Sequence, residues 1–306
     1  MNKIFPISVI AVIVLLVGGW VWLSPASPTR DNRPTLAVTI FPLADIAERI
    51  AGDRWNVVLI IPPGTTEHTR SLAPQTVASL QGAQALFMIG HGLDTVLAGQ
   101  ISGAIGSLPQ VVVDKGIELR EFEIDHAHQE EEGEEHEEGD LDPHYWLSIP
   151  NGQQIARNIT AHMVEIDPDH TEEYEQNLNA YIAELDMLEE QLQAIAAQAP
   201  QMHFISAHDA WGYLASQYGF ELVGTFEPTE GREPSPADIQ HLEELITEYS
   251  IAAFYTEPQK QSSSATRLFG DGLGLDIKVL DPVGGLAGRE SYIDLMRYNV
   301  STLAAN

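Results

Sequence analysis

The apolar residues of the chain recur in two similar sets after Pro34. In the first set, amphipathic stretches at 43–50 and 74–80 predict helices, and four apolar runs predict buried strands: residues 36–40, 57–61, 85–89 and 110–113. The second set has strand runs at 202–206, 221–226, 251–256 and 277–280 and helical stretches at 211–218, 235–249 and 263–269. Because strands that alternate with helices are typical of parallel sheets, we predict an α/β protein with two lobes, each with a mostly parallel sheet flanked by helices.

A long helical pattern separates the two sets. Its apolar residues recur at alternating spacings of four and three: Tyr174, Leu178, Tyr181, Leu185, Leu188, Leu192 and Ile195. Asp169 or Thr171 is available as the N-cap, and Pro200 ends the pattern. At about 1.5 Å per residue the helix is on the order of 40 Å long. We therefore predict a first lobe at 34–165, a connecting helix at 166–200 and a second lobe at 201–306, with only small opening motions between the lobes.

The first 33 residues predict export from the cytoplasm. Lys3 is the only charged residue before an apolar stretch from Ile4 to Leu23, and a polar, proline-rich segment follows it. This layout is typical of a signal peptide, with a small-residue cleavage site near Ala26. About 20 apolar residues can also span a bilayer, so an uncleaved membrane anchor is the alternative. In both cases the body is extracytoplasmic, either periplasmic or tethered to the outer face of the membrane.

Composition excludes several classes of partner and site. With 15 Lys and Arg against 45 Asp and Glu, the formal charge is −30, which repels a nucleic-acid backbone. The chain has no Cys, so disulfides, thiolate zinc sites, iron–sulfur clusters and cysteine nucleophiles are excluded. A metal ion would therefore have to be bound by His, Asp or Glu.

The segment 121–142 differs in composition from the rest of the chain. It holds 12 acidic residues, no basic residue and three histidines, His126, His128 and His136. Such a run cannot bury enough apolar surface to fold, so we predict a mobile loop. It is either a solvated spacer or a weak, adaptable site for divalent cations of the borderline class.

Four other residues follow predicted strands or precede a helical pattern. His68, His208 and Asp281 each come just after a strand run, and His144 lies directly before the next helical pattern. In open α/β sheets ligands bind at the carboxyl ends of the strands, so these positions predict a metal cleft between the lobes, with two ligands from each lobe. The remaining five histidines lack this context, and we interpret them as structural or surface residues: His91, His162, His170, His203 and His241.

Five motifs, in order along the chain, resemble those of the metal-binding receptors of ABC-type importers, in the branch that takes zinc or manganese: residues 64–68, 142–147, 206–213, 257–259 and 280–282. The resemblance extends from about Pro34 to a terminal helix at Tyr292–Ala304. It includes the acidic insert, which in zinc-specific members also precedes the motif Asp142-Pro143-His144.

The resemblance implies a ligand set. His68, His144 and His208 match the imidazole positions of the family, Asp281 matches a carboxylate of the second lobe, and Glu67 matches a glutamate beside the metal in zinc-specific members. Asp281, Glu67 or a water molecule completes the coordination, and we favour Asp281 for its position after a strand. Three neutral imidazoles suit tetrahedral Zn²⁺, whereas Mn²⁺ prefers more oxygen ligands, so zinc is expected as the cargo and manganese is the alternative.

The expected function is therefore capture and delivery. A monomer outside the cytoplasm binds Zn²⁺, docks on the membrane permease of an ABC transporter and releases the ion for import, without catalysis. The rival from another class is a secreted zinc hydrolase with Glu67 as general base. The sequence argues against it, because it has no His-Glu-x-x-His helix, no ligands for a second ion and no glycine-rich phosphate loop.

Overall fold

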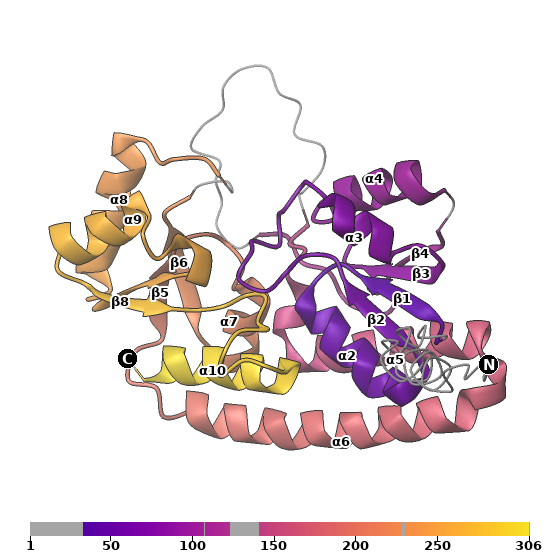
Figure 1. Cartoon of the computed structure of the whole chain (residues 1–306). Helices are drawn as coiled ribbons and strands as arrows, with labels where there is room; N and C mark the ends of the chain where they lie inside the picture. Colours follow the sequence, from indigo (N-terminus) through magenta and orange to yellow (C-terminus); the bar gives the residue numbers. More distant parts are fainter. Residues whose placement is uncertain (1–32, 107, 123–140, 228–230, 306) are drawn as a thin grey trace, which may run out of the picture. The chain divides into compact units, whose positions relative to one another are not determined.

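A four-stranded parallel sheet with the strand order β2-β1-β3-β4 forms the centre of the first lobe (Figure 1). Its strands are β1 (Thr35–Val38), β2 (Asn56–Leu59), β3 (Ala83–Met88) and β4 (Gln110–Val112). The helices of this lobe are α2 (Phe41–Ala51), α3 (Pro74–Ser79), α4 (Thr95–Ile105) and α5 (Ile149–Ile166). The central strands are apolar at successive positions because both faces of the sheet are covered: Leu36, Ala37 and Val38 are fully buried.

The second lobe repeats this arrangement, with a parallel sheet in the order β6-β5-β7-β8. Its strands are β5 (His203–Ser206), β6 (Glu221–Thr225), β7 (Ala253–Thr256) and β8 (Asp276–Val279). The helices are α7 (Gly212–Tyr218), α8 (Pro236–Glu248), α9 (Ser264–Thr266) and α10 (Tyr292–Ala304). The helix expected at 263–269 is short, because after α9 the chain continues as a π-helix over Arg267–Gly272.

One helix, α6 (Thr171–Ala196), runs along both lobes. At the first lobe Asn177 Nδ2 donates to the carbonyl of Ile50 at 3.0 Å, and at the second Gln193 Nε2 donates to the carbonyl of Gln217 at 3.1 Å. The prediction of its N-cap was wrong: the cap is His170, because residues 168–170 form a 3₁₀ turn that delivers the chain to the helix one residue later than Asp169.

The lobes are also joined through α10. The hydroxyl of Tyr292 donates to the carbonyls of Trp146 at 2.6 Å and Ser148 at 3.1 Å, and the amide of Tyr292 donates to Asp45 Oδ2 at 3.0 Å. In return Trp146 Nε1 donates to the carbonyl of Pro282 at 2.7 Å. Trp146 and Tyr292 are fully buried, so the lobes are joined here by a continuous core rather than by a flexible connection.

The computed structural model describes residues 33–106, 108–122, 141–227 and 231–305. Residues Pro34–Asn306 form one compact unit. The expected signal or anchor and most of the acidic segment, including its three histidines, lie outside the described residues. Within the described ranges, the helices all lack the combination of length and apolarity that crossing a membrane requires. The domain boundaries at 165/166 and 200/201 stay a prediction.

Candidate metal site

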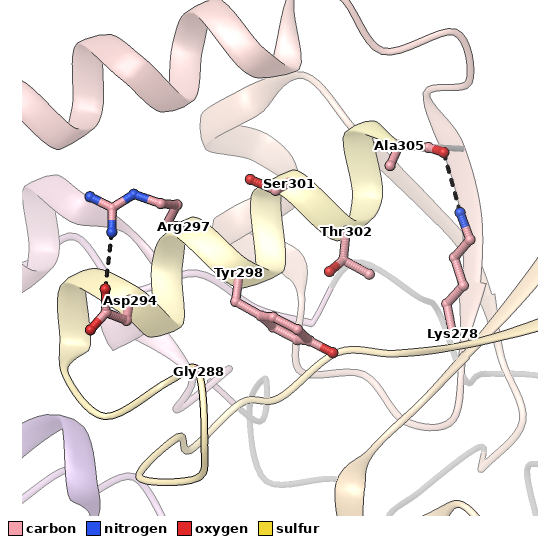
Figure 2. A pocket seen from close by; sticks show the side chains of 8 residues that line it. All are labelled: Lys278, Gly288, Asp294, Arg297, Tyr298, Ser301, Thr302 and Ala305. Carbon is pink, nitrogen blue, oxygen red and sulfur yellow. Dashed lines mark hydrogen bonds and ion pairs between the residues drawn. The ribbon is translucent and has the colours of Figure 1, made fainter.

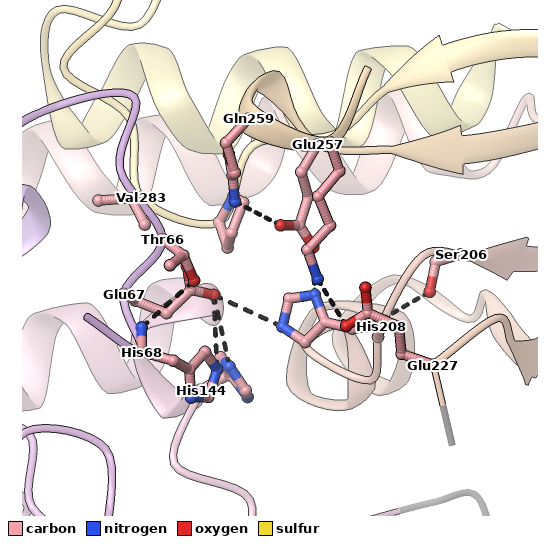
Figure 3. A network of polar contacts seen from close by, with 12 residues as sticks. Thr66, Glu67, His68, His144, Ser206, His208, Glu227, Glu257, Gln259 and Val283 are labelled. Atoms are coloured by element: carbon pink, nitrogen blue, oxygen red, sulfur yellow. Dashed lines mark hydrogen bonds and ion pairs between the residues drawn. The ribbon is translucent and has the colours of Figure 1, made fainter. Parts of the chain in front are cut away.

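Four side chains from three distant parts of the sequence meet where the two lobes face each other (Figure 3). Glu67 and His68 lie on the loop after β2, His144 lies just before a 3₁₀ turn at Tyr145–Leu147, and His208 follows β5. Each offers one ligand atom, and these four atoms lie within 4.8 Å of one another. In the described part of the chain, this is the only such group of three or more His, Asp or Glu residues.

The three imidazoles surround one carboxylate oxygen. Glu67 Oε1 lies 3.5 Å from Nε2 of His208, 3.6 Å from Nε2 of His144 and 3.9 Å from Nε2 of His68. The ring centroids are separated by 5.4 to 5.7 Å. Glu67, His144 and His208 are buried, and His68 is partly exposed. Three ring nitrogens and one carboxylate oxygen therefore lie close together in a mostly buried group.

A carboxylate sets the orientation of His144. Asp142 Oδ1 accepts a hydrogen bond from the backbone amide of His144 at 2.9 Å and lies 2.7 Å from its ring Nδ1. With Nδ1–H donating to Asp142, the lone pair of the His144 Nε2 atom is directed into the site. The spacing Asp142-Pro143-His144 makes this contact local, because the turn returns the carboxylate to the ring two residues later.

His208 has an equivalent partner from another strand. Its Nδ1 contacts Oε1 of Glu257, which directly follows β7, and Gln259 Nε2 donates to the other oxygen of Glu257 at 2.5 Å. The hydroxyl of Ser206 donates to the backbone carbonyl of His208 at 2.7 Å. The neighbouring parallel strands β5 and β7 end at the same edge of the sheet, which places His208 beside Glu257.

The electrostatics of the group follow from burial and these contacts. Burial by itself would raise the pKa of Glu67, but contacts with His144 and His208 lower it well below its ordinary value. Burial by itself would lower the pKa of His144, but Asp142 and Glu67 raise it to about 9. Burial opposes the charge of His208 as well, yet Glu257 and Glu67 raise its pKa well above the ordinary value. The raised pKa values of His144 and His208 and the lowered pKa of Glu67 favour a carboxylate beside two imidazolium rings, and a cation can bind there by displacing protons.

Asp281, the preferred fourth ligand from the sequence, is not a member of the group of four. Its Oδ1 accepts hydrogen bonds from the backbone amides of Val283 at 3.0 Å and Gly284 at 2.9 Å. Its Oδ2 forms an ion pair with Arg289 Nε at 3.3 Å. The cluster thus contains Glu67 rather than Asp281, with three of its residues from the first lobe and one from the second, and the ligand set expected from the sequence stays a prediction.

Sequence reasoning overlooked the contacts of Asp142 with His144, of Glu257 with His208 and of Arg289 with Asp281. Asp142 and Glu257 were within recognised motifs, and the two-residue spacing to a histidine was the available signal for Asp142. The partners of the remaining histidines agree with a structural role: His91 pairs with Asp114, His170 with Asp167 and His203 with Glu221.

The group of four is separate from a surface groove of about 430 Å³ on the second lobe (Figure 2). The groove lies between α10 and β8, and Lys278, Arg297 and Tyr298 are among its lining residues. None of the four clustered residues lines it.

Known proteins are similar to this chain in both sequence and fold. The family profile of ZnuA, the periplasmic component A of the zinc-uptake complex, matches residues 36–306. The high-affinity zinc uptake system protein ZnuA of Bacillus subtilis is 31% identical over 284 residues, which cover 91% of this chain and 89% of the relative. A manganese-binding lipoprotein, MntA of Halalkalibacterium halodurans, is 29% identical over 312 residues, covering 100% of this chain and 99% of the relative.

A crystal structure of ZnuA superimposes with a TM-score of 0.76 at 27% identity, covering 90% of this chain and 99% of that chain. A zinc-bound deletion mutant of ZnuA superimposes with a TM-score of 0.75, also at 27% identity, covering 89% and 97% of the two chains. The two-lobed fold with a connecting helix, expected from the sequence, is thereby confirmed. With a family profile matched over nearly the whole body of the chain, this protein belongs to the ZnuA family of periplasmic zinc-uptake components.

Proposed function

We propose that this protein is an extracytoplasmic receptor that captures Zn²⁺ between its lobes and delivers it to the permease of an ABC transporter. One observation carries the proposal: Nε2 atoms of three histidines, two from the first lobe and one from the second, point at the same carboxylate oxygen. Similarity to zinc-uptake proteins over most of the chain supports the same conclusion.

The ligands in this proposal are His68, His144 and His208, with Glu67 as the fourth. Three imidazole nitrogens and one carboxylate oxygen match the tetrahedral coordination of Zn²⁺, with bonds of about 2.0 to 2.2 Å. Ligand atoms of such a tetrahedron lie about 3.3 to 3.6 Å apart. Glu67 Oε1 lies 3.5 to 3.9 Å from the three ring nitrogens, so binding requires only short movements of these side chains. Asp281 stays outside the coordination in this assignment, and manganese, which prefers more oxygen ligands, is the second candidate because a manganese-binding relative exists.

Release follows from the uneven distribution of the ligands. His208 is the only one of the four that belongs to the second lobe, so a displacement of the lobes by a few ångströms removes one imidazole and leaves three ligands on the first lobe. The continuous core beneath the cleft and α6 restrict larger motions. A small displacement is sufficient because coordination bonds tolerate little stretching. Docking on the permease supplies this displacement in our proposal.

The proposal assigns no catalytic step to the protein. Hydrolysis by zinc requires an open coordination position and a general base, whereas Glu67 lies among the imidazoles as a ligand. Incubation of the zinc-loaded protein with peptide, ester and phosphate substrates should give no turnover proportional to the amount of bound metal. Turnover that rises with zinc occupancy would favour the hydrolase instead.

The test is calorimetric titration of the metal-free protein with Zn²⁺ and with Mn²⁺. The wild type should show one tight site per chain, and His208→Ala should lose more than about 100-fold in zinc affinity, since it removes a ligand rather than a supporting contact. His203→Ala is the matched control. His203 is the first residue of β5, at the end of the strand opposite to His208, and it pairs with Glu221 rather than with the group of four. Equal zinc binding by wild type and His208→Ala would refute the proposed site.

The location outside the cytoplasm also belongs to the proposal. It rests on the apolar N-terminal segment and on relatives described as periplasmic or as lipoproteins. Mass spectrometry of the mature protein distinguishes a chain that begins near residue 27, which indicates cleavage, from one that keeps the whole segment.

A further inference from the structure

Asp281 precedes a loop that packs against the loop of Glu67, but its carboxylate forms an ion pair with Arg289. The loop that follows it packs against the loop that carries Glu67: a Cβ on Gly285 would lie 2.6 Å from Cγ of Pro63. Asp281 is 3% exposed, and the charge of Glu67 contributes to raising its pKa after the larger effect of burial. Its carboxylate nevertheless lies outside the group of four, with Oδ2 paired to Arg289 Nε at 3.3 Å.

Arg289 is itself fixed in position. Its guanidinium carbon lies 4.5 Å from the centroid of the Tyr298 ring, and the Tyr298 hydroxyl donates to the backbone carbonyl of Val279 at 2.9 Å. Figure 2 shows the Tyr298 side chain extending from α10 toward the strand that precedes Asp281. The backbone of Arg289 closes a turn, because its amide donates to the carbonyl of Leu286 and its carbonyl accepts from the amide of Gly285, both at 2.8 Å. A stacked, mostly buried guanidinium of this kind holds its carboxylate in a defined place.

We infer that Arg289 is a specificity-determining residue: by holding Asp281 in an ion pair it keeps this carboxylate off the metal, so that the site stays four-coordinate and prefers Zn²⁺ to Mn²⁺. The inference rests on the proposed function, because it concerns the ion that the same site selects. It goes further in assigning the selectivity to a residue that contacts none of the proposed ligands.

The physical reason lies in the number of oxygen ligands. Three imidazoles and one carboxylate complete the tetrahedral shell of Zn²⁺. A second carboxylate would raise the coordination number to five or six and would add the oxygen ligands that Mn²⁺ prefers. Asp281 is the candidate for that second carboxylate, because the loop after it packs against the loop that carries Glu67, and the ion pair with Arg289 competes with the metal for it. Loss of the guanidinium frees Asp281 to turn into the site.

The variant that tests this is Arg289→Met, which removes the charge and keeps an unbranched side chain against Tyr298. Its Mn²⁺ affinity should rise on the order of tenfold relative to its Zn²⁺ affinity, which is the scale of effects from groups around a metal shell. X-ray absorption of the Mn²⁺ complex should show an additional oxygen ligand. Arg289→Lys retains the positive charge and should keep the wild-type ratio. The double variant Arg289→Met with Asp281→Asn should return the ratio to that of the wild type.

Asp281→Asn alone provides a second test in case Arg289→Met does not fold. Asn can still accept from the amides of Val283 and Gly284, so the loop should be retained. Zinc affinity should change less than about threefold, because Asp281 is not a ligand in the wild type. An unchanged Mn²⁺ to Zn²⁺ ratio in folded Arg289→Met, or a loss of more than tenfold in zinc affinity in Asp281→Asn, would overturn the inference.

These outcomes are separate from those that test the function itself. If wild type binds one zinc ion and His208→Ala does not, the proposed function stands whatever the ratio in Arg289→Met. If wild type binds no zinc at the group of four, the function fails, and the inference about Arg289 fails with it.

Discussion

The ring of His144 is oriented by two contacts from a single carboxylate. Asp142 Oδ1 meets both the backbone amide and the Nδ1 atom of His144, so the carboxylate is fixed to the backbone and the ring cannot rotate without losing its Nδ1 contact. The ring Nδ1 of His208 contacts Glu257, a partner that follows a different strand. At the scale of single residues, the site is therefore a set of imidazoles whose directions are determined by carboxylates behind them.

Asp142→Ala should reduce zinc affinity by about 10- to 100-fold, because the His144 ring loses the acceptor that orients it and increases its basicity. Competition with a zinc chelator at constant pH measures the effect. Asp114→Ala is the matched control, since Asp114 pairs with His91 at 2.8 Å in a similar contact outside the group of four. Equal, small changes in the two variants would show that Asp142 does not act through His144.

The pKa of His144 predicts how zinc affinity depends on pH. Burial opposes its charge, but Asp142 and Glu67 raise the pKa of His144 to about 9, so the metal-free ring is protonated at neutral pH. Zinc binds only the neutral ring, so binding releases this proton and apparent affinity should rise from pH 6.5 toward pH 9. An ordinary histidine would give a plateau above about pH 6.5.

Calorimetry at pH 7.5 in buffers of different ionisation enthalpy counts the protons released, and at least one per zinc ion is expected. No proton release would contradict the raised pKa. The same shift stabilises the metal-free fold at low pH. This contribution is complete below the unfolded value near 6.5 and is lost as the pH rises through about 9.

At the scale of elements, the two ends of the acidic segment are anchored to the second lobe. Glu121 pairs with Leu141 in an antiparallel bridge, and the amide of Asp142 donates to the carbonyl of Arg120 at 2.9 Å. The Tyr213 hydroxyl of α7 accepts from the amide of Arg120 at 3.0 Å and lies 3.2 Å from the carbonyl of Asp142. The segment thus begins and ends at one place, directly beside the residue that orients His144.

Replacement of residues 123–140 by a short glycine linker should leave the tight zinc site intact, because the paired ends are already adjacent and the four clustered residues lie outside the deletion. Calorimetric titration should still give one tight site with an affinity within about threefold of the wild type, and only weak additional binding should disappear. A longer deletion that also removes Asp142 serves as the comparison. This variant should bind zinc less tightly, because His144 loses the carboxylate that orients its ring. Loss of all zinc binding in the shorter deletion would show that the segment supplies essential ligands.

At the scale of the whole molecule, close packing between helices of different lobes joins the two lobes. Gly152 of α5 lies against Tyr292 of α10, where a Cβ would be 2.4 Å from the hydroxyl oxygen and 2.7 Å from ring carbons. That hydroxyl hydrogen-bonds to the carbonyls of Trp146 and Ser148. Glycine at position 152 therefore allows α10 of the second lobe to pack closely against α5 of the first lobe.

Gly152→Ala should destabilise the protein by about 1 to 3 kcal/mol, since the buried Tyr292 must move and its hydrogen bonds weaken. Urea unfolding of the metal-free protein measures the change. Gly103→Ala in α4 is the control, because a Cβ there meets nothing within 4 Å and the replacement should be neutral or stabilising by up to about 1 kcal/mol. A Gly152→Ala variant as stable as Gly103→Ala would show that the contact can relax without cost.

Local patterns were sufficient for most of the architecture. The apolar runs predicted the eight strands of the described residues to within a few residues, and the central strands are apolar at successive positions because both faces of the sheet are covered. The spacing from Tyr174 to Ile195 predicted the connecting helix, since its periodicity is a local property. The first turn of that helix was less predictable: the 3₁₀ turn at 168–170 shifted its cap to His170.

The sequence by itself determined the two lobes, the connecting helix and the histidines at the edges of the sheets, because apolar periodicity and strand ends are encoded in neighbouring residues. Only the tertiary structure decided which carboxylates face those histidines. Glu67 lies among the rings, while Asp281 is held by Arg289, Val283 and Gly284. Such choices depend on hydrogen bonds and ion pairs between segments that meet only after folding, and spacing along the chain carries no information about their geometry.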